Sequence, residues 1–185
     1  MKEKKQPWSV AEIAYIGVMA AIILAVTEFR IPLGESKVHL ANAFCLLAGM
    51  LLGPVSGGLA SGIGSALYDV FAGYDVAGIL ITFVSKFAMA WVCGKLMPDR
   101  ENKRLNLHRT VLASIAGALT YVALYMLKTY VYQRIVYQNP LDAVAIVMWG
   151  KLIPSLINAL AAVIVAPILY HALRPALKAL KIRQR

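Results

Sequence analysis

Acidic residues, cysteine and histidine are scarce in this sequence of 185 residues, which contains nine Asp and Glu, two Cys and three His. Cys45 and Cys93 lie in apolar runs and form no CxxC pair, so neither a disulfide framework nor a zinc site is indicated. The apolar segments also lack a carboxylate pair or a deep histidine that could activate a nucleophile. We therefore expect neither an enzyme nor a metal site.

Charged residues make up only 15% of the chain, whereas hydrophobic residues make up 60%, and this excludes a soluble domain. A bilayer-spanning helix uses roughly 20 apolar residues, so the chain can supply about six spans with short connections. We predict an all-α integral membrane protein in which residues 1–185 form one compact bundle of six transmembrane helices. The predicted spans are approximately residues 9–29, 39–53, 55–73, 77–97, 109–131 and 143–173.

Basic residues are distributed unequally between the two sides of this predicted bundle. One side carries Lys2, Lys4, Lys5, Lys95, Arg100, Lys103, Arg104, Arg109, Arg174, Lys178, Lys181, Arg183 and Arg185, and the other carries Arg30, Lys37 and Arg134. Cytoplasmic loops are enriched in Lys and Arg, so we expect both termini and the 98–108 loop in the cytoplasm. The net charge of +10 then reflects topology and contact with anionic lipid, and it does not indicate a nucleic-acid partner.

Three lysines fall inside predicted spans, where a charge is costly and usually faces a partner or a watery cavity. Lys128 lies near the outer end of its span and can snorkel to the interface. Lys86 and Lys151 each lie about nine residues from the outer ends of their spans, and at ~1.5 Å rise per residue this predicts similar depth and one shared cavity. The alternative is internal pairing of Lys86 with Asp69 or Asp75.

Polar residues at helical spacing share a face with these lysines and predict a ligand pocket. The candidate ligand-binding residues are Thr82, Lys86, Tyr121, Tyr125, Lys151, Ser155 and Asn158, with His39 and Asn42 at the start of the second span. The mixture suits a small polar or aromatic ligand, and two lysines favour one with a carboxylate, a phosphate or a strong carbonyl acceptor. Residues 30–38 are expected to form a lid over the outer end. The alternative is that these groups satisfy one another inside the bundle.

Small residues form strips that permit close helix approach. On the first span they are Ala14, Gly17, Ala21 and Ala25, and on the third they are Gly58, Gly62 and Ala66. We expect the third-span strip to pack within the chain, whereas the first-span strip can pack inside the bundle or against another subunit. The second and third spans are joined only by GPVSGG at 53–58, which predicts a tight helical hairpin.

The stretch VHLANAFCLLAGMLLGPVSGGLASGIGSALYDVFAGY at 38–74 resembles the substrate-binding S components of energy-coupling factor (ECF) vitamin transporters. Its most specific part is the pattern LLxGxxLGPxxGGLAxGIGSALxD at 46–69. The resemblance implies a six-helix protein of a prokaryotic plasma membrane that binds a vitamin or related micronutrient from outside with high affinity. The substrate stays open among pyridoxine-like, pyrimidine, corrinoid, queuosine-type and other ligands.

The same resemblance implies partners: a transmembrane coupling subunit and two ATPase subunits that use ATP, while this chain carries no cofactor. The sequence agrees, because it contains no GxxxxGK[ST] phosphate loop. The family's coupling surface maps to Gly17, Ala21 and Ala25. The alternatives are a stand-alone membrane transporter or channel, against which the lack of an internal repeat counts, and a purely structural subunit.

Overall fold

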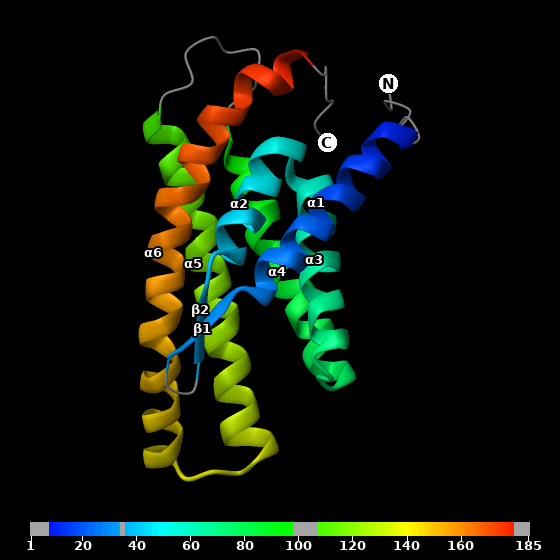
Figure 1. Ribbon diagram of the computed structural model, residues 1–185. Helices are drawn as coiled ribbons and strands as arrows, with labels where there is room; N and C mark the ends of the chain where they lie inside the picture. The colour runs from blue at the N-terminus through cyan, green and yellow to red at the C-terminus, as the bar shows by residue number, and fades with distance from the viewer. Residues whose placement is uncertain (1–7, 34–35, 98–106, 180–185) are drawn as a thin grey trace, which may run out of the picture.

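Six α-helices dominate the computed structural model, which describes residues 8–33, 36–97 and 107–179 (Figure 1). They are α1 (Val10–Glu28), α2 (Ala41–Leu52), α3 (Pro54–Phe71), α4 (Val76–Leu96), α5 (Leu107–Val131) and α6 (Leu141–Ala179). A π-helical segment, η1 (Tyr132–Val136), extends α5. Each of the six predicted segments therefore forms one helix, with bounds that differ by only a few residues except at the C-terminal end of α6.

Four helical segments are long and apolar enough to cross a bilayer: Val10–Glu28, Val76–Leu96, Leu107–Val136 and Leu141–Leu173. Helix α2 is apolar but has only 12 residues. At ~1.5 Å rise per residue it spans about 18 Å, whereas the hydrocarbon core is about 30 Å thick. The structure thus supports four of the predicted spans by length and composition, and a count of six stays a prediction.

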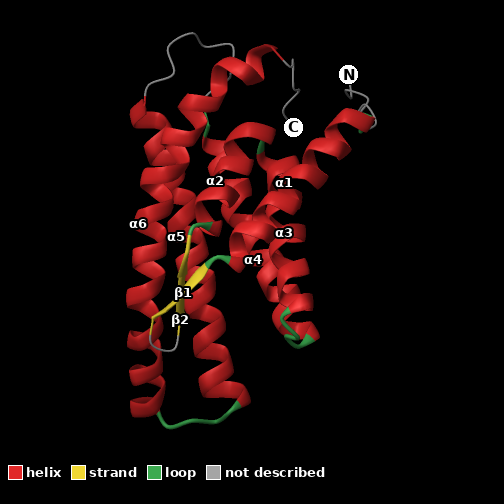
Figure 2. Cartoon of the chain, in the orientation of Figure 1, coloured by secondary structure: helices red, strands yellow, loops and turns green. Residues whose placement is uncertain are grey.

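The connection between α1 and α2 corrects the expectation of a purely helical chain. It forms an antiparallel pair of short strands, β1 (Arg30–Leu33) and β2 (Ser36–His39), in the segment for which the sequence predicted a lid (Figure 2). Arg30 lies opposite His39, and Ile31 lies opposite Val38. The β-branched pair favours extended backbone, and strand pairing satisfies backbone donors and acceptors that a loop would leave to water. Residues 34–35 of the predicted lid lie outside the described residues.

Helix α2 occupies the centre of the bundle. It packs against α1, α3, α4, α5 and α6, and eleven of its residues are buried. A helix that is apolar all round is expected where other helices enclose it. Burial of α2 explains how a helix too short to span the bilayer is accommodated, because its ends face protein.

The predicted α2–α3 hairpin is present and very tight. Gly53 alone separates the two helices and has φ +88°, a left-handed conformation that favours glycine, and Pro54 begins α3. A Cβ at Gly57 would lie 2.5 Å from the carbonyl oxygen of Ala48. The glycines of this segment therefore let the two helix backbones approach each other closely.

Gly57→Val is expected to destabilise the bundle, because the new side chain would collide with α2 backbone that cannot move away. Overpacking of this kind costs about 1–3 kcal/mol, which should lower the thermal unfolding temperature of the detergent-solubilised protein. Gly17→Ala is the control, because a Cβ at Gly17 meets nothing within 4 Å. Equal unfolding temperatures for the two variants would contradict the close approach at Gly57.

Helix α1 begins and α6 ends at the same end of the bundle, as predicted for the two termini (Figure 1). At the opposite end, α5 and α6 extend beyond α3 and α4. Residues 1–7 and 180–185 and most of the predicted cytoplasmic loop, 98–106, lie outside the described residues. The cytoplasmic orientation therefore stays a prediction.

Candidate functional site

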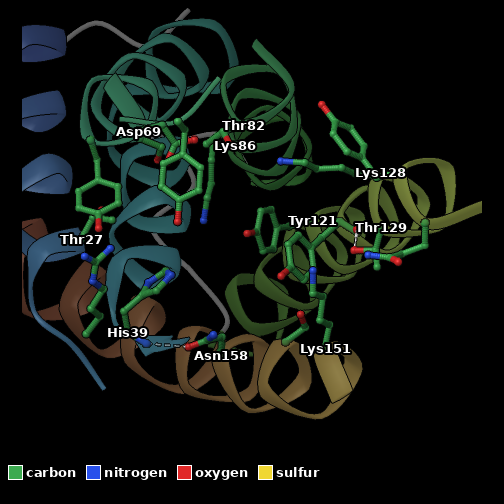
Figure 3. Close-up of a pocket in the computed structure, with 18 of the residues that line it drawn as sticks. Thr27, His39, Asp69, Thr82, Lys86, Tyr121, Lys128, Thr129, Lys151 and Asn158 are labelled. Atoms are coloured by element: carbon green, nitrogen blue, oxygen red, sulfur yellow. Dashed lines mark hydrogen bonds between the residues drawn. The ribbon is translucent and has the colours of Figure 1, made fainter. Parts of the chain in front are cut away.

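A cavity of about 420 Å³ lies among α3, α4, α5, α6 and the β1–β2 hairpin (Figure 3). This volume is in the range of about 300–1,000 Å³ that is usual for small-molecule sites. The wall includes eight of the nine predicted ligand-binding residues: His39, Thr82, Lys86, Tyr121, Tyr125, Lys151, Ser155 and Asn158. The structure brings these residues together, and their contact with a ligand stays a prediction.

Lys86 is the most deeply buried charge of the wall, with 5% of its surface exposed. Its ammonium donates a hydrogen bond to Oδ1 of Asn42 and lies 4.0 Å from the centre of the Tyr121 ring. Asp75, one of the two carboxylates considered as its partner, instead caps α4 by accepting a hydrogen bond from the N–H of Gly78 at 2.9 Å. Among the described residues, Lys86 is thus held by an amide and a ring face.

Asn42 does not line the cavity, although it was expected to meet a ligand from above. It is 1% exposed, in the first turn of α2, behind Lys86. The difference arises because α2 is enclosed by other helices, which turns a residue at a predicted span mouth into a buried one. Asn42 positions the lysine.

The predicted polar stripe of α6 faces the cavity. Ser155 and Asn158 are buried, and Lys151 is half-buried. Oδ1 of Asn158 accepts a hydrogen bond from the backbone N–H of His39 at 2.9 Å (Figure 3). This bond ties the end of β2 to α6, so the hairpin forms a fixed part of the cavity wall.

Two tyrosines of α5 form an aromatic section of the wall. Tyr121 and Tyr125 lie one helical turn apart and stack with ring centres 5.9 Å apart and planes at 13°. Nearer the start of α5, Ser114 is buried and donates a hydrogen bond to the carbonyl of Thr110 inside the bundle. The cavity-lining face of α5 therefore begins at Tyr121.

Several wall residues were not predicted to bind ligand. Arg30 lies over the Tyr68 ring at 4.9 Å, and Lys128, which was expected to snorkel, lies 5.7 Å from the Tyr132 ring centre and lines the cavity. Lys128 and Tyr132 are four residues apart, a spacing that places two side chains next to each other on a helix, so their contact could have been predicted from the sequence. Nothing in the sequence indicated the first pair, because its residues come from β1 and α3.

The predicted coupling strip, Gly17, Ala21 and Ala25, lies on the exposed face of α1. The opposite face of α1 packs against α3, with Ala20 and Ile23 buried. The strip is therefore not used for packing among the described residues, and its role in coupling stays a prediction.

The small residues of α3 pack within the chain, as expected. A Cβ at Gly58 would lie 2.8 Å from the Phe87 ring, and one at Gly62 would lie 2.8 Å from the Phe83 ring. Their absent side chains make room for these two aromatic rings of α4. Close packing of α3 and α4 thereby fixes the helix that carries Lys86.

No group of three His, Cys, Asp or Glu is placed to hold a metal ion within residues 8–33, 36–97 and 107–179. The chemistry offered by the cavity is that of a binding site: ammonium groups, hydroxyls, an amide and aromatic faces. Such groups can orient and desolvate a small molecule.

Comparison with known proteins places this geometry in context. A family model described as "ECF-type riboflavin transporter, S component" matches residues 7–175. An uncharacterized protein of Pyrococcus woesei is 34% identical over 105 residues, which cover 56% of this chain and 70% of that protein. A UPF0397 protein of Lactiplantibacillus plantarum is 39% identical over 70 residues, covering 36% of this chain and 38% of that protein.

A solved structure shares the fold. It is described as "Structure and mechanism of the S component of a bacterial ECF transporter" and superposes with a TM-score of 0.69. The superposition covers 91% of this chain and 98% of that one, at 20% sequence identity. At this identity the likeness establishes the arrangement of the helices and carries nothing about the ligand.

Proposed function

Because the chain belongs to the family of ECF-type riboflavin transporter S components, we propose that it captures a vitamin or related micronutrient in the cavity described above. Proteins of this family are transport subunits, not enzymes. The observation that carries the proposal is the convergence of Lys86, Tyr121 and Lys151, from three different helices, on one cavity of about 420 Å³. A ligand held there would contact charged, hydroxyl and aromatic groups together.

The side from which the ligand enters follows from the proposed topology. The β1–β2 hairpin, whose residues Arg30 and His39 line the cavity, lies away from the end at which α1 begins and α6 ends (Figure 1). With both termini in the cytoplasm of a prokaryotic cell and the chain crossing the plasma membrane several times, the hairpin side faces outward. The ligand then enters past the hairpin.

Delivery into the cell requires partners in this proposal. The chain has no phosphate-binding loop, so ATP would be hydrolysed by two ATPase subunits that act through a transmembrane coupling subunit. The exposed strip Gly17, Ala21 and Ala25 suits that contact, because small residues let a partner helix approach closely in lipid. No cofactor is needed in this chain.

Two measurements test the proposal. Native mass spectrometry of the gently purified chain should detect a retained small molecule, because high-affinity ligands survive purification. Uptake of that molecule by proteoliposomes should require co-reconstituted coupling and ATPase subunits. Uptake by the chain alone would instead indicate a stand-alone transporter, and a chain that never retains or binds a small molecule would contradict the binding role.

A further inference from the structure

Positive charge is in excess around the cavity. Among the residues that the structure describes, four basic side chains line it, against one carboxylate, that of Asp69. The basic residues are Arg30, Lys86, Lys128 and Lys151. With His39 neutral, the described part of the wall carries a formal excess of three positive charges. Such an excess in a partly enclosed site attracts anions, because electrostatic interactions strengthen where water is excluded.

The contacts of Lys86 leave its charge uncompensated. Its partners, the Asn42 amide oxygen and the Tyr121 ring face, are neutral, although the side chain is only 5% exposed. A buried charge is costly unless it is paired with an opposite charge. The described residues around Lys86 therefore stabilise the ammonium by hydrogen bonding and by cation–π contact, and they supply no counter-ion at hydrogen-bonding distance.

Lys151 approaches the same space from the opposite wall. It is the eleventh residue of α6, as Lys86 is of α4, and Figure 3 shows the two side chains directed toward Tyr121 from different sides. Within the described ranges, Lys151 makes no hydrogen bond, ion pair or ring contact. Its ammonium is therefore available to a ligand without the loss of an existing interaction.

The stacked rings of Tyr121 and Tyr125 indicate the shape of a ligand that would bind the Lys151 ammonium. Two nearly parallel rings on one helix, those of Tyr121 and Tyr125, give an aromatic section to the cavity that Lys151 also lines. Planar aromatic molecules pack well on such surfaces, with a gain beyond simple area burial. A phospholipid headgroup would match the charge and would leave the aromatic section unused.

On the premise of the proposed function, we propose that the ligand is a planar aromatic molecule carrying a carboxylate or a phosphate. Its ring packs against Tyr125, beside the Tyr121 ring that Lys86 covers, and its anionic group binds the ammonium of Lys151. Lys86, fixed by Asn42, keeps the cavity positive without having to move. Capture would then be driven both by aromatic contact and by neutralisation of a charge that the protein leaves open.

The test uses two pairs of probes that differ by one phosphate: riboflavin with riboflavin 5′-phosphate, and pyridoxine with pyridoxine 5′-phosphate. Binding to the full chain in phosphatidylcholine nanodiscs is measured by titration calorimetry. The phosphorylated member of a pair that binds should bind at least about 10-fold more tightly, because a charge-assisted hydrogen bond adds to the ring contact. Lys151→Gln should remove most of that preference, because it should lower the affinity of the phosphorylated member far more than that of the neutral member.

Two further variants keep the result interpretable. Lys151→Arg retains the charge and should retain the preference, which distinguishes an electrostatic role from a purely structural one. Lys95→Gln is the matched control, because Lys95 is exposed near the opposite end of α4 and does not line the cavity. It should bind all four probes as the unchanged chain does.

The outcomes separate the inference from the function on which it rests. Equal or tighter binding of the neutral members would overturn the inference and leave the binding role intact. If none of the four probes binds, the molecule retained in native mass spectrometry decides: an aromatic acid supports the inference, whereas a neutral molecule or a phospholipid overturns it. A chain that retains nothing and binds nothing would overturn the proposed function together with the inference.

Discussion

Ala21→Trp and Ala25→Trp should each abolish uptake by the assembled transporter and leave ligand binding unchanged. Both alanines are exposed on α1, on the face opposite the one that packs against α3, and neither lines the cavity. A tryptophan at either position would hold a partner helix several ångströms away and remove the close packing on which helix association in lipid depends. The measurements are ligand uptake by proteoliposomes that contain the coupling and ATPase subunits, and ligand binding by the isolated chain.

Leu160→Trp provides the matched control for these variants. Leu160 is 64% exposed on α6, so it tests the effect of adding the same large side chain to another lipid-facing position. It should support normal uptake. Loss of ligand binding in the α1 variants would falsify the separation of coupling from binding, and normal uptake would remove the strip from the coupling surface.

Lys86→Met should weaken ligand binding by about 10- to 100-fold, the range expected for loss of an interaction with a charged group. Methionine fills a similar volume, so the change removes the charge without opening a large cavity. The affinity is measured by titration calorimetry with the molecule identified by native mass spectrometry. Unchanged affinity would assign Lys86 to the structure of the bundle alone.

A second variant separates binding from stability at this position. Lys86→Met leaves Oδ1 of Asn42 buried without its donor, which costs about 1–3 kcal/mol of stability. The double variant Lys86→Met/Asn42→Leu removes both polar groups and should recover part of the thermal stability without recovering affinity. Recovery of affinity as well would mean that the single variant bound weakly only because it was destabilised.

The sequence predicted correctly those features that depend on the residue spacing within one helix or on the depth of a residue in the membrane. Apolar runs of suitable length located all six helices, and counting residues from the outer span ends placed Lys86 and Lys151 on one cavity. Helical spacing on one element also grouped Lys151, Ser155 and Asn158 correctly. Spacing along one helix and distance from the end of a span can both be counted directly in a linear sequence.

The remaining features depend on contacts between segments that are distant in the chain. The central position of α2 buries Asn42, and no pattern within α2 indicates which neighbours enclose it. The bond from His39 to Asn158 joins residues 119 positions apart. The Arg30–Tyr68 pair likewise requires knowledge of how the hairpin packs beside α3. A single sequence contains the residues of such pairs and gives no measure of their proximity.

The shortness of α2 also determines how much room there is for a ligand. The helix spans about 18 Å, by its rise per residue, of a hydrocarbon layer about 30 Å thick. At its N-terminal end, Asn42 of the first turn holds Lys86, and the preceding hairpin lines the cavity. Evolution could therefore enlarge or reduce the cavity by moving the start of this one helix, while the long helices that face the lipid and the partner subunits stay the same.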